Sequence, residues 1–132
     1  MNIWEERKAN YEGLHETILE EARRQFREVE KRIDNTAPTS ITKTPKAGHC
    51  SLTIGPPPES KYHYILAVEV TPDEKREEAH ANAWVSGSGG KEFVASAVFS
   101  LDEPDEEKAR LWVPDAVAAT RKRYAQRVDL PE

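Results

Sequence analysis

The amino-acid sequence predicts a two-layer α+β domain, in which a long N-terminal helix and a kinked C-terminal helix accompany a four-stranded antiparallel meander sheet. Two observations predict this architecture. Apolar residues recur every three or four positions near both ends of the chain, whereas they alternate with other residues through its middle. The length of 132 residues corresponds to one domain, so we expect a single core.

The first predicted element is a helix over residues 3–34. Its apolar positions form one stripe, which contains Trp4, Tyr11, Leu14, Ile18, Ala22, Phe26, Val29 and Ile33. The remaining positions are rich in Glu, Arg and Lys, as in a helix with one buried side. Asn2 followed by Glu5 indicates a capping box at the start, and Asn35 and Pro38 favour a stop. A domain of this size would bury only part of such a helix, so one end should project or pair with another chain.

Residues 36–48 are rich in threonine and proline, which is typical of a flexible connector. The sheet is predicted from the alternation that follows, with strands over residues 49–54, 62–70, 79–86 and 92–101. Three prolines follow the first of these strands. Because proline cannot donate a hydrogen bond to a neighbouring strand, we expect that strand at an edge of the sheet.

The two faces of the predicted sheet differ in composition. One is apolar, with small residues in its centre: Tyr62, Tyr64, Leu66, Val68, Val70, Ala79, Ala81, Ala83, Val85, Phe93, Ala95, Ala97, Phe99 and Leu101. The alanines indicate that a helix lies close against this face. The other face mixes polar and apolar side chains, and strand alternation places Ile65, Trp84, Val94 and Val98 on it. In the simplest register Glu69 would lie opposite His80, which is an ordinary cross-strand contact.

The C-terminal region, residues 104–128, keeps helical spacing but contains Pro114. A proline inside a helix removes a hydrogen bond and its ring clashes with the preceding turn. We therefore expect two helical pieces hinged near Pro114. The alternative is a fifth strand over residues 109–113, followed by a helix that begins at Pro114.

Composition excludes several classes of protein. A net charge of −5 argues against a nucleic-acid-binding protein, because phosphate contacts need concentrated positive charge. No apolar stretch approaches the roughly 20 residues that span a membrane, and no signal peptide is evident, so a cytoplasmic protein is expected. The single cysteine, Cys50, provides neither an internal disulfide nor a zinc-site motif. No catalytic residue, metal or cofactor is predicted, and the chain is not expected to be an enzyme.

A partner-binding surface is the functional prediction that the residues support. Tryptophan at a solvent-facing strand position is costly unless something covers it, so Ile65, Trp84, Val94 and Val98 predict an interface. The alternative is that the C-terminal helix covers this face. Acidic residues on the links at one end of the sheet, including Asp102, Glu103, Glu106 and Glu107, would suit a basic partner.

The predicted function is therefore that of a small accessory protein, such as an inhibitor, an immunity protein or a chaperone, which binds another protein non-covalently. One alternative is a small-ligand-binding or weakly catalytic domain, whose pocket between sheet and N-terminal helix would be lined by Tyr62, Tyr64 and Phe93. The other is a structural homo-oligomer, with a homodimer as its simplest form.

Overall fold

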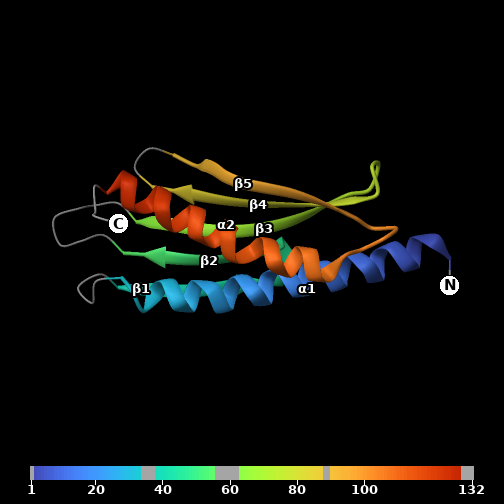
Figure 1. Ribbon diagram of the computed structural model, residues 1–132, viewed down its shortest axis with the longest axis horizontal. Coiled ribbons are helices and arrows are strands. Elements are labelled where there is room, and N and C mark those ends of the chain that lie inside the picture. Colours follow the sequence, from blue (N-terminus) through green and yellow to red (C-terminus); the bar gives the residue numbers. More distant parts are fainter. Residues whose placement is uncertain (1, 34–37, 56–62, 88–89, 129–132) are drawn as a thin grey trace.

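The computed structural model describes residues 2–33, 38–55, 63–87 and 90–128, which form two helices and a five-stranded antiparallel sheet (Figure 1). The elements are α1 (Ile3–Glu30), β1 (Thr39–Thr44), the short 3-10 helix η1 (Pro45–Ala47), β2 (His49–Ile54), β3 (Tyr64–Asp73), β4 (Glu78–Ser86), β5 (Glu92–Ser100) and α2 (Glu106–Arg127). The strands are ordered as they occur in the chain. The predicted α+β class and antiparallel meander are confirmed, but the sheet has one more strand than expected.

Both helices lie on the same face of the sheet, side by side and running in the same direction (Figure 1). α1 contacts β1, β2 and β3, whereas α2 contacts β3, β4 and β5. In the described part of the chain, no helix or strand covers the opposite face, which we call the outer face. The alternative in which the C-terminal helix covers that face is therefore wrong.

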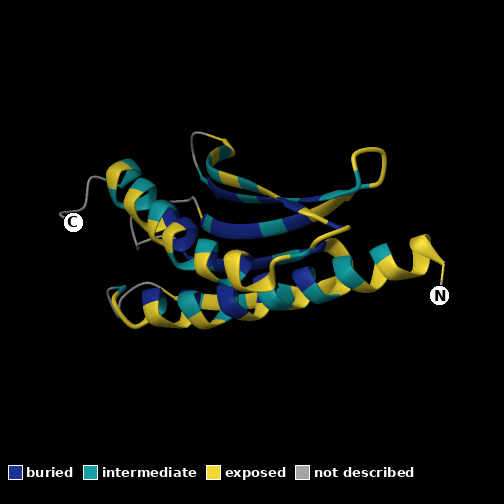
Figure 2. Cartoon of the chain, turned by 45° about the vertical axis from the view of Figure 1, so that its right-hand side comes forward, coloured by how far each residue is buried: buried dark blue, intermediate teal, exposed yellow. Residues whose placement is uncertain are grey.

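Helix α1 is buried over only part of its length. The Glu5 backbone N–H donates to Oδ1 of Asn2 at 3.0 Å, which confirms the predicted start. Buried residues begin at Leu14, and the first turns extend past the strands (Figure 2). The helix ends at Glu30 rather than at residue 34. The expected stop signal at Asn35 lies outside the described residues.

Strand β1 was not predicted, because residues 36–48 were interpreted as a connector. Its only apolar side chain is Ile41, which packs against the core, so it lacks a hydrophobic alternation. Lys43 also faces α1, where its Nζ lies 3.0 Å from Oε1 of Glu16 and 2.8 Å from Oε2 of Glu20. Because β1 pairs with β2, the predicted edge position of strand 49–54 is wrong.

A β-bulge in β5 changes which residues reach the outer face. Ala83 pairs with Ala95, but the next residue, Trp84, pairs with Phe93, so Val94 is an extra residue in β5. Phe93 therefore shares the outer face with Trp84, whereas Val94 packs against the core. The predictions that Val94 lies on the outer face and Phe93 in the core are both wrong.

Helix α2 continues through Pro114 without ending there, so the prediction of two helical pieces is wrong, and the alternative strand over 109–113 is absent. An internal proline costs about 3 kcal/mol. Val113 and Val117 are both buried beside it, and burial of each valine stabilises the helix by roughly 1.5 to 3 kcal/mol. Packing against the sheet therefore offsets the lost hydrogen bond.

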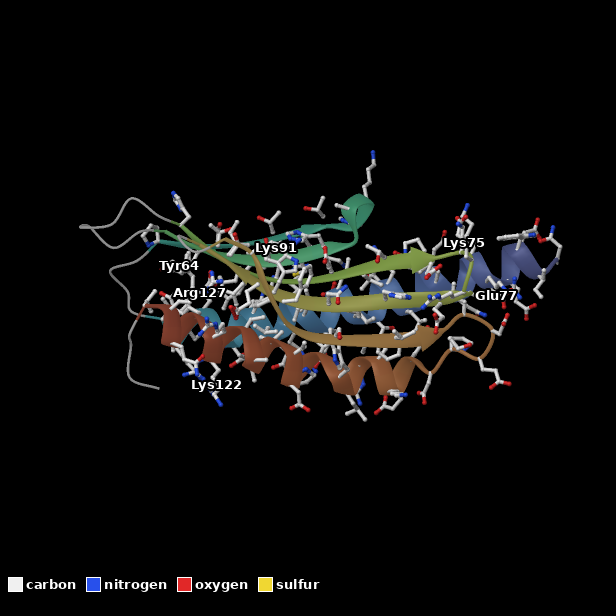
Figure 3. All side chains as sticks on the ribbon, turned by 90° about the horizontal axis from the view of Figure 1, so that it is seen from above. Tyr64, Lys75, Glu77, Lys91, Lys122 and Arg127 are labelled. Carbon is white, nitrogen blue, oxygen red and sulfur yellow. The ribbon has the colours of Figure 1, made fainter. Side chains whose placement is uncertain are left out.

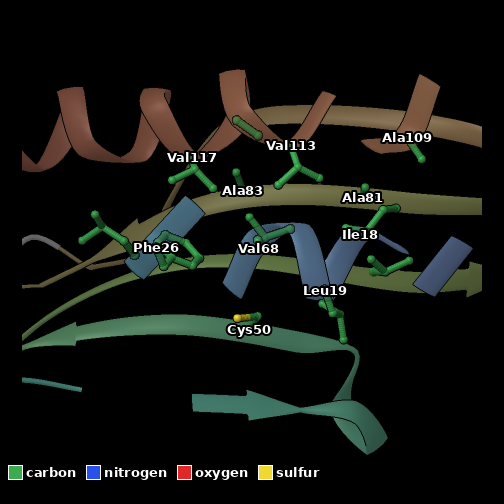
Figure 4. Close-up of a cluster of buried hydrophobic side chains, with 14 of the residues drawn as sticks. Ile18, Leu19, Phe26, Cys50, Val68, Ala81, Ala83, Ala109, Val113 and Val117 are labelled. Carbon is green, nitrogen blue, oxygen red and sulfur yellow. The ribbon is translucent and has the colours of Figure 1, made fainter. Parts of the chain in front are cut away.

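The core lies between the helices and the sheet, and its centre is narrow (Figure 4). Ala79, Ala81 and Ala83 are fully buried on β4, as the alanine row predicted. Tyr64 is also in this core, where its ring and that of Tyr124 form a T-shaped, edge-to-face pair with 5.4 Å between the ring centres. The expected pocket lined by Tyr64 and Phe93 does not form, because Phe93 faces outward, and Tyr62 lies outside the described residues. No helix in the described residues has the length and apolar character needed to cross a membrane.

Candidate functional site

The outer face is built from the residues that alternate with the core residues of each strand. Its central row runs across the sheet through paired residues: Thr42, Ser51, Ala67, Trp84 and Phe93. The next row contains Thr44, His49, Glu69, Asn82 and Ser96. Small polar residues therefore predominate on the β1 side of this face, whereas its largest apolar side chains, Trp84 and Phe93, lie on β4 and β5.

Four side chains form a contact group that we call the Trp84 cluster: His49, Trp84, Lys91 and Phe93. Lys91 Nζ lies 4.4 Å from the centre of the Trp84 ring and 5.0 Å from that of Phe93, which are cation–π distances. The centre of the His49 ring lies 5.6 Å from that of Trp84, with the two rings tilted by 32°. Burial lowers the pKa of His49, and nearby Lys91 lowers it further, although Glu69 acts in the opposite direction.

Exposure differs sharply within the cluster. Trp84 is only 8% exposed, because its own neighbours cover it, whereas Phe93 is 56% exposed. The buried indole N–H of Trp84 finds no acceptor among the described residues. Trp84 is thus buried beneath its neighbours and supports Lys91 and Phe93. Phe93 is the apolar side chain of the cluster that is most accessible to a partner.

The structure does not assemble the four residues that the sequence predicted as one patch. Ile65 lies opposite Ser86 rather than Trp84, and Val98 lies opposite His80, two rows from the Trp84 cluster. Phe93 occupies the place expected for Val94. The sequence holds one signal for this change, since two adjacent apolar residues at 93–94 interrupt the strand alternation, as a bulge does.

The acidic links do meet at one end of the sheet, as the predicted meander requires. The Leu101 backbone N–H donates to the Glu77 carbonyl at 2.9 Å. Arg7 bridges the same two segments. Its guanidinium lies 2.9 Å from Oε1 of Glu77, and its Nε lies 2.8 Å from Oδ1 of Asp102. This hydrogen bond from Arg7 lowers the pKa of the Asp102 carboxyl. Figure 3 shows Glu77 and Lys75 at the end of the molecule opposite Lys91.

The acidic residues of the predicted site differ in their surroundings. Asp102 pairs with Arg7, and Glu107 pairs with Arg110, whose hydrogen bond lowers the pKa of Glu107. Glu103 and Glu106 remain exposed to solvent. Arginines that the sequence prediction did not consider therefore neutralise part of the acidic end.

A second group of polar side chains comes together on the outer face near the β3–β4 hairpin. His80 Nε2 lies 3.5 Å from Oδ2 of Asp73 and 3.7 Å from Oε1 of Glu78. These are nitrogen and oxygen donors of the types that bind Zn²⁺, although exposed acidic groups also gather without a metal. The sequence prediction missed the group because His80 pairs with Thr71 instead of Glu69. The expectation that the protein needs no metal stays a prediction.

A cavity of about 350 Å³ lies between the first turns of α1 and the β3–β4 hairpin, at the acidic end. Its apolar walls come from Trp4, Tyr11, Pro72 and Leu101. Its charged lining residues have both signs: Arg7, Lys8, Glu5, Glu74 and Glu77. The Tyr11 hydroxyl donates to the Val70 carbonyl at 3.1 Å, which holds the inner wall in place. This cavity is far from the pocket that the sequence suggested.

Comparisons of the chain with protein-family models, with curated proteins and with solved structures found no match.

Proposed function

We propose that the protein works by binding another protein non-covalently through the outer face, around the Trp84 cluster. One observation carries the proposal. Both helices pack on the other side of the sheet and no described element covers the outer face, although it presents Phe93 at 56% and Val98 at 47% exposure. Large apolar side chains on an uncovered face favour a protein interface. An accessory role as an inhibitor, immunity protein or chaperone fits this mode of action.

The Trp84 cluster has the properties of an interface anchor. Phe93 would bury its exposed ring on binding, and aromatic residues at the centre of an interface contribute much of its binding energy. Trp84 and Lys91 hold that ring from one side, so little side-chain entropy would be lost. The Trp84 indole N–H lacks an acceptor within the described chain, so an acceptor supplied by the partner would satisfy it.

A basic partner is the finer form of this proposal. Glu103 and Glu106 are exposed at the acidic end and would attract positive charge over a distance. Asp102 and Glu107 would contribute less, because each is already paired with an arginine. Steering of this kind would raise the association rate more than it would lower the dissociation rate.

The test compares Phe93→Asp with wild type in quantitative capture from the native host, read by mass spectrometry. Thr42→Asp is the matched control, because Thr42 is exposed on the same face at the far edge of the sheet. Proteins bound by wild type should be lost with Phe93→Asp and kept with Thr42→Asp. All three chains should have the same circular-dichroism spectrum. If every captured protein also binds Phe93→Asp, the proposal fails.

The cavity beside α1 favours one second candidate, the binding of a small ligand. Its volume of about 350 Å³ lies at the lower end of the range of known ligand pockets, roughly 300 to 1,000 Å³. Trp4 and Tyr11 would supply stacking surfaces, and Arg7 lies at the wall. A ligand of this cavity would raise the melting temperature of wild type but not of Trp4→Ala, whereas a ligand elsewhere would stabilise both.

A further inference from the structure

Strand β5 has a free edge whose protection is confined to its start, at Glu92 and the bulge at Val94. It is the last strand of the sheet, and no described strand pairs with its other side (Figure 1). Free edges carry unpaired backbone N–H and C=O groups, and proteins usually protect them with charged residues, proline, short strands or β-bulges. The opposite edge strand, β1, has such protection: it has 6 residues, contains Lys43 and lies between Pro38 and Pro45. In β5, by contrast, residues 93–100 contain neither a charged residue nor proline.

The sequence of β5 is also self-complementary. Residues 93–99 read Phe-Val-Ala-Ser-Ala-Val-Phe, which is the same in both directions. Residues 93–100 are all small or apolar, so an antiparallel copy of this strand brings no charged side chain to the free edge, whichever residue lies at the two-fold axis. The bulge at Val94 limits a regular ladder to residues 95–100.

We propose that the edge of β5 pairs antiparallel with β5 of a second copy of this chain. A two-fold axis at Ala97 places Ala97 opposite its own copy, Ala95 opposite Phe99 of the second copy, and Ser96 opposite Val98 of the second copy. Residues directly opposite each other share a face, so both core-side pairs and outer-face pairs match. The two pairs that flank the axis then each set a small side chain beside a larger one, and Ala97 lies opposite Ala97.

The surroundings of the edge agree with this arrangement. Val98 is 47% exposed on β5, and Leu111 of α2 is 57% exposed, so the region carries apolar surface that a second copy would shield. Trp112 of α2 and Phe99 form a T-shaped, edge-to-face pair with 6.4 Å between the ring centres, which places an aromatic pair beside β5. The two sheets would continue into one, and both outer faces would lie on the same side. This inference does not depend on the proposed outer-face partner.

Sedimentation equilibrium of the full chain tests the proposal. The protein concentration is varied over a range of about 100-fold, because mass action governs the monomer–dimer equilibrium. Wild type should reach twice the chain mass of 15.0 kDa, and Val98→Lys should remain at 15.0 kDa. Thr42→Lys, on the protected edge strand, should behave like wild type. Phe93→Asp should also remain dimeric, since Phe93 precedes the ladder. A wild type that is monomeric throughout, or a dimer that survives Val98→Lys, overturns the proposal.

Cross-linking tests the register even if Val98→Lys folds poorly. A mixture of Ser96→Cys and Val98→Cys chains should form a disulfide-linked dimer containing one chain of each kind. A mixture of Ser96→Cys and Thr42→Cys chains is the control and should form several-fold less. The native Cys50 is fully buried and should not interfere. Equal linkage in both mixtures would contradict pairing through β5.

Discussion

Enlarging Ala81 tests whether the helices press directly on the sheet, which decides whether a ligand cavity can exist between them. Ala81 is fully buried on β4, and Figure 4 shows it beneath α2, near Ala109. In a close-packed core, Ala81→Leu forces neighbouring side chains apart and should lower the free energy of unfolding by about 1 to 3 kcal/mol. In an empty space, the added carbons would instead stabilise the fold by about 2 kcal/mol, at roughly 0.8 kcal/mol for each carbon.

The expected change is large enough to measure by thermal unfolding. An unfolding entropy of about 2.1 cal/mol/K per residue gives about 0.28 kcal/mol/K for 132 residues. A loss of about 2 kcal/mol should therefore lower the melting temperature by about 7 °C, followed by circular dichroism.

The matched control is Ala118→Leu, because Ala118 is exposed on α2 and has room for a larger side chain. Its melting temperature should change little. A higher melting temperature for Ala81→Leu would refute the close packing. It would also revive the ligand pocket between helix and sheet.

Two further predictions follow from individual residues. Pro114→Ala should raise the free energy of unfolding by up to about 3 kcal/mol in urea unfolding, because α2 is continuous at this position and alanine restores a backbone donor; a destabilised variant would contradict this. Burial raises the pKa of the Cys50 thiol from 9.0 to about 11, so its contribution to stability is fully present below pH 9 and is lost as the pH rises toward 11. Cys50→Ala should therefore flatten the alkaline loss of stability in urea titrations, and an unchanged slope would exclude this cause.

The candidate site shows which side-chain positions can be predicted from residue patterns in the sequence. Trp84 and Val98 were predicted on the outer face and lie there, because strand alternation holds along each uninterrupted segment. Val94 and Phe93 exchanged faces, since one extra residue in a strand reverses every side chain beyond it. The predicted contact between Glu69 and His80 failed for a related reason, because register depends on the pairing of two strands.

The positions of the acidic residues were predicted, but their environments were not. The meander order alone places both acidic links at one end of the sheet, and the contact between Leu101 and Glu77 confirms it. Arg7 lies on α1, far away in the sequence, and reaches Asp102 only after the helix packs on the sheet. The neutralisation of that end is therefore a property of the tertiary structure.

The sequence by itself determined the elements whose burial repeats locally: α1, the C-terminal helical region, the core side of β2 to β4, and the alanine row. The regular spacing of apolar residues reveals these elements, because each of them buries one face against the same core. Only the tertiary structure decided that β1 joins the sheet, that Val94 forms a bulge, and that α2 passes through Pro114. Strand pairing and packing energies between distant segments outweigh weak local preferences at these positions, and of the three features only the bulge leaves a local signal, the adjacent apolar residues at 93–94. The same non-local packing placed both helices on one face and left the outer face uncovered.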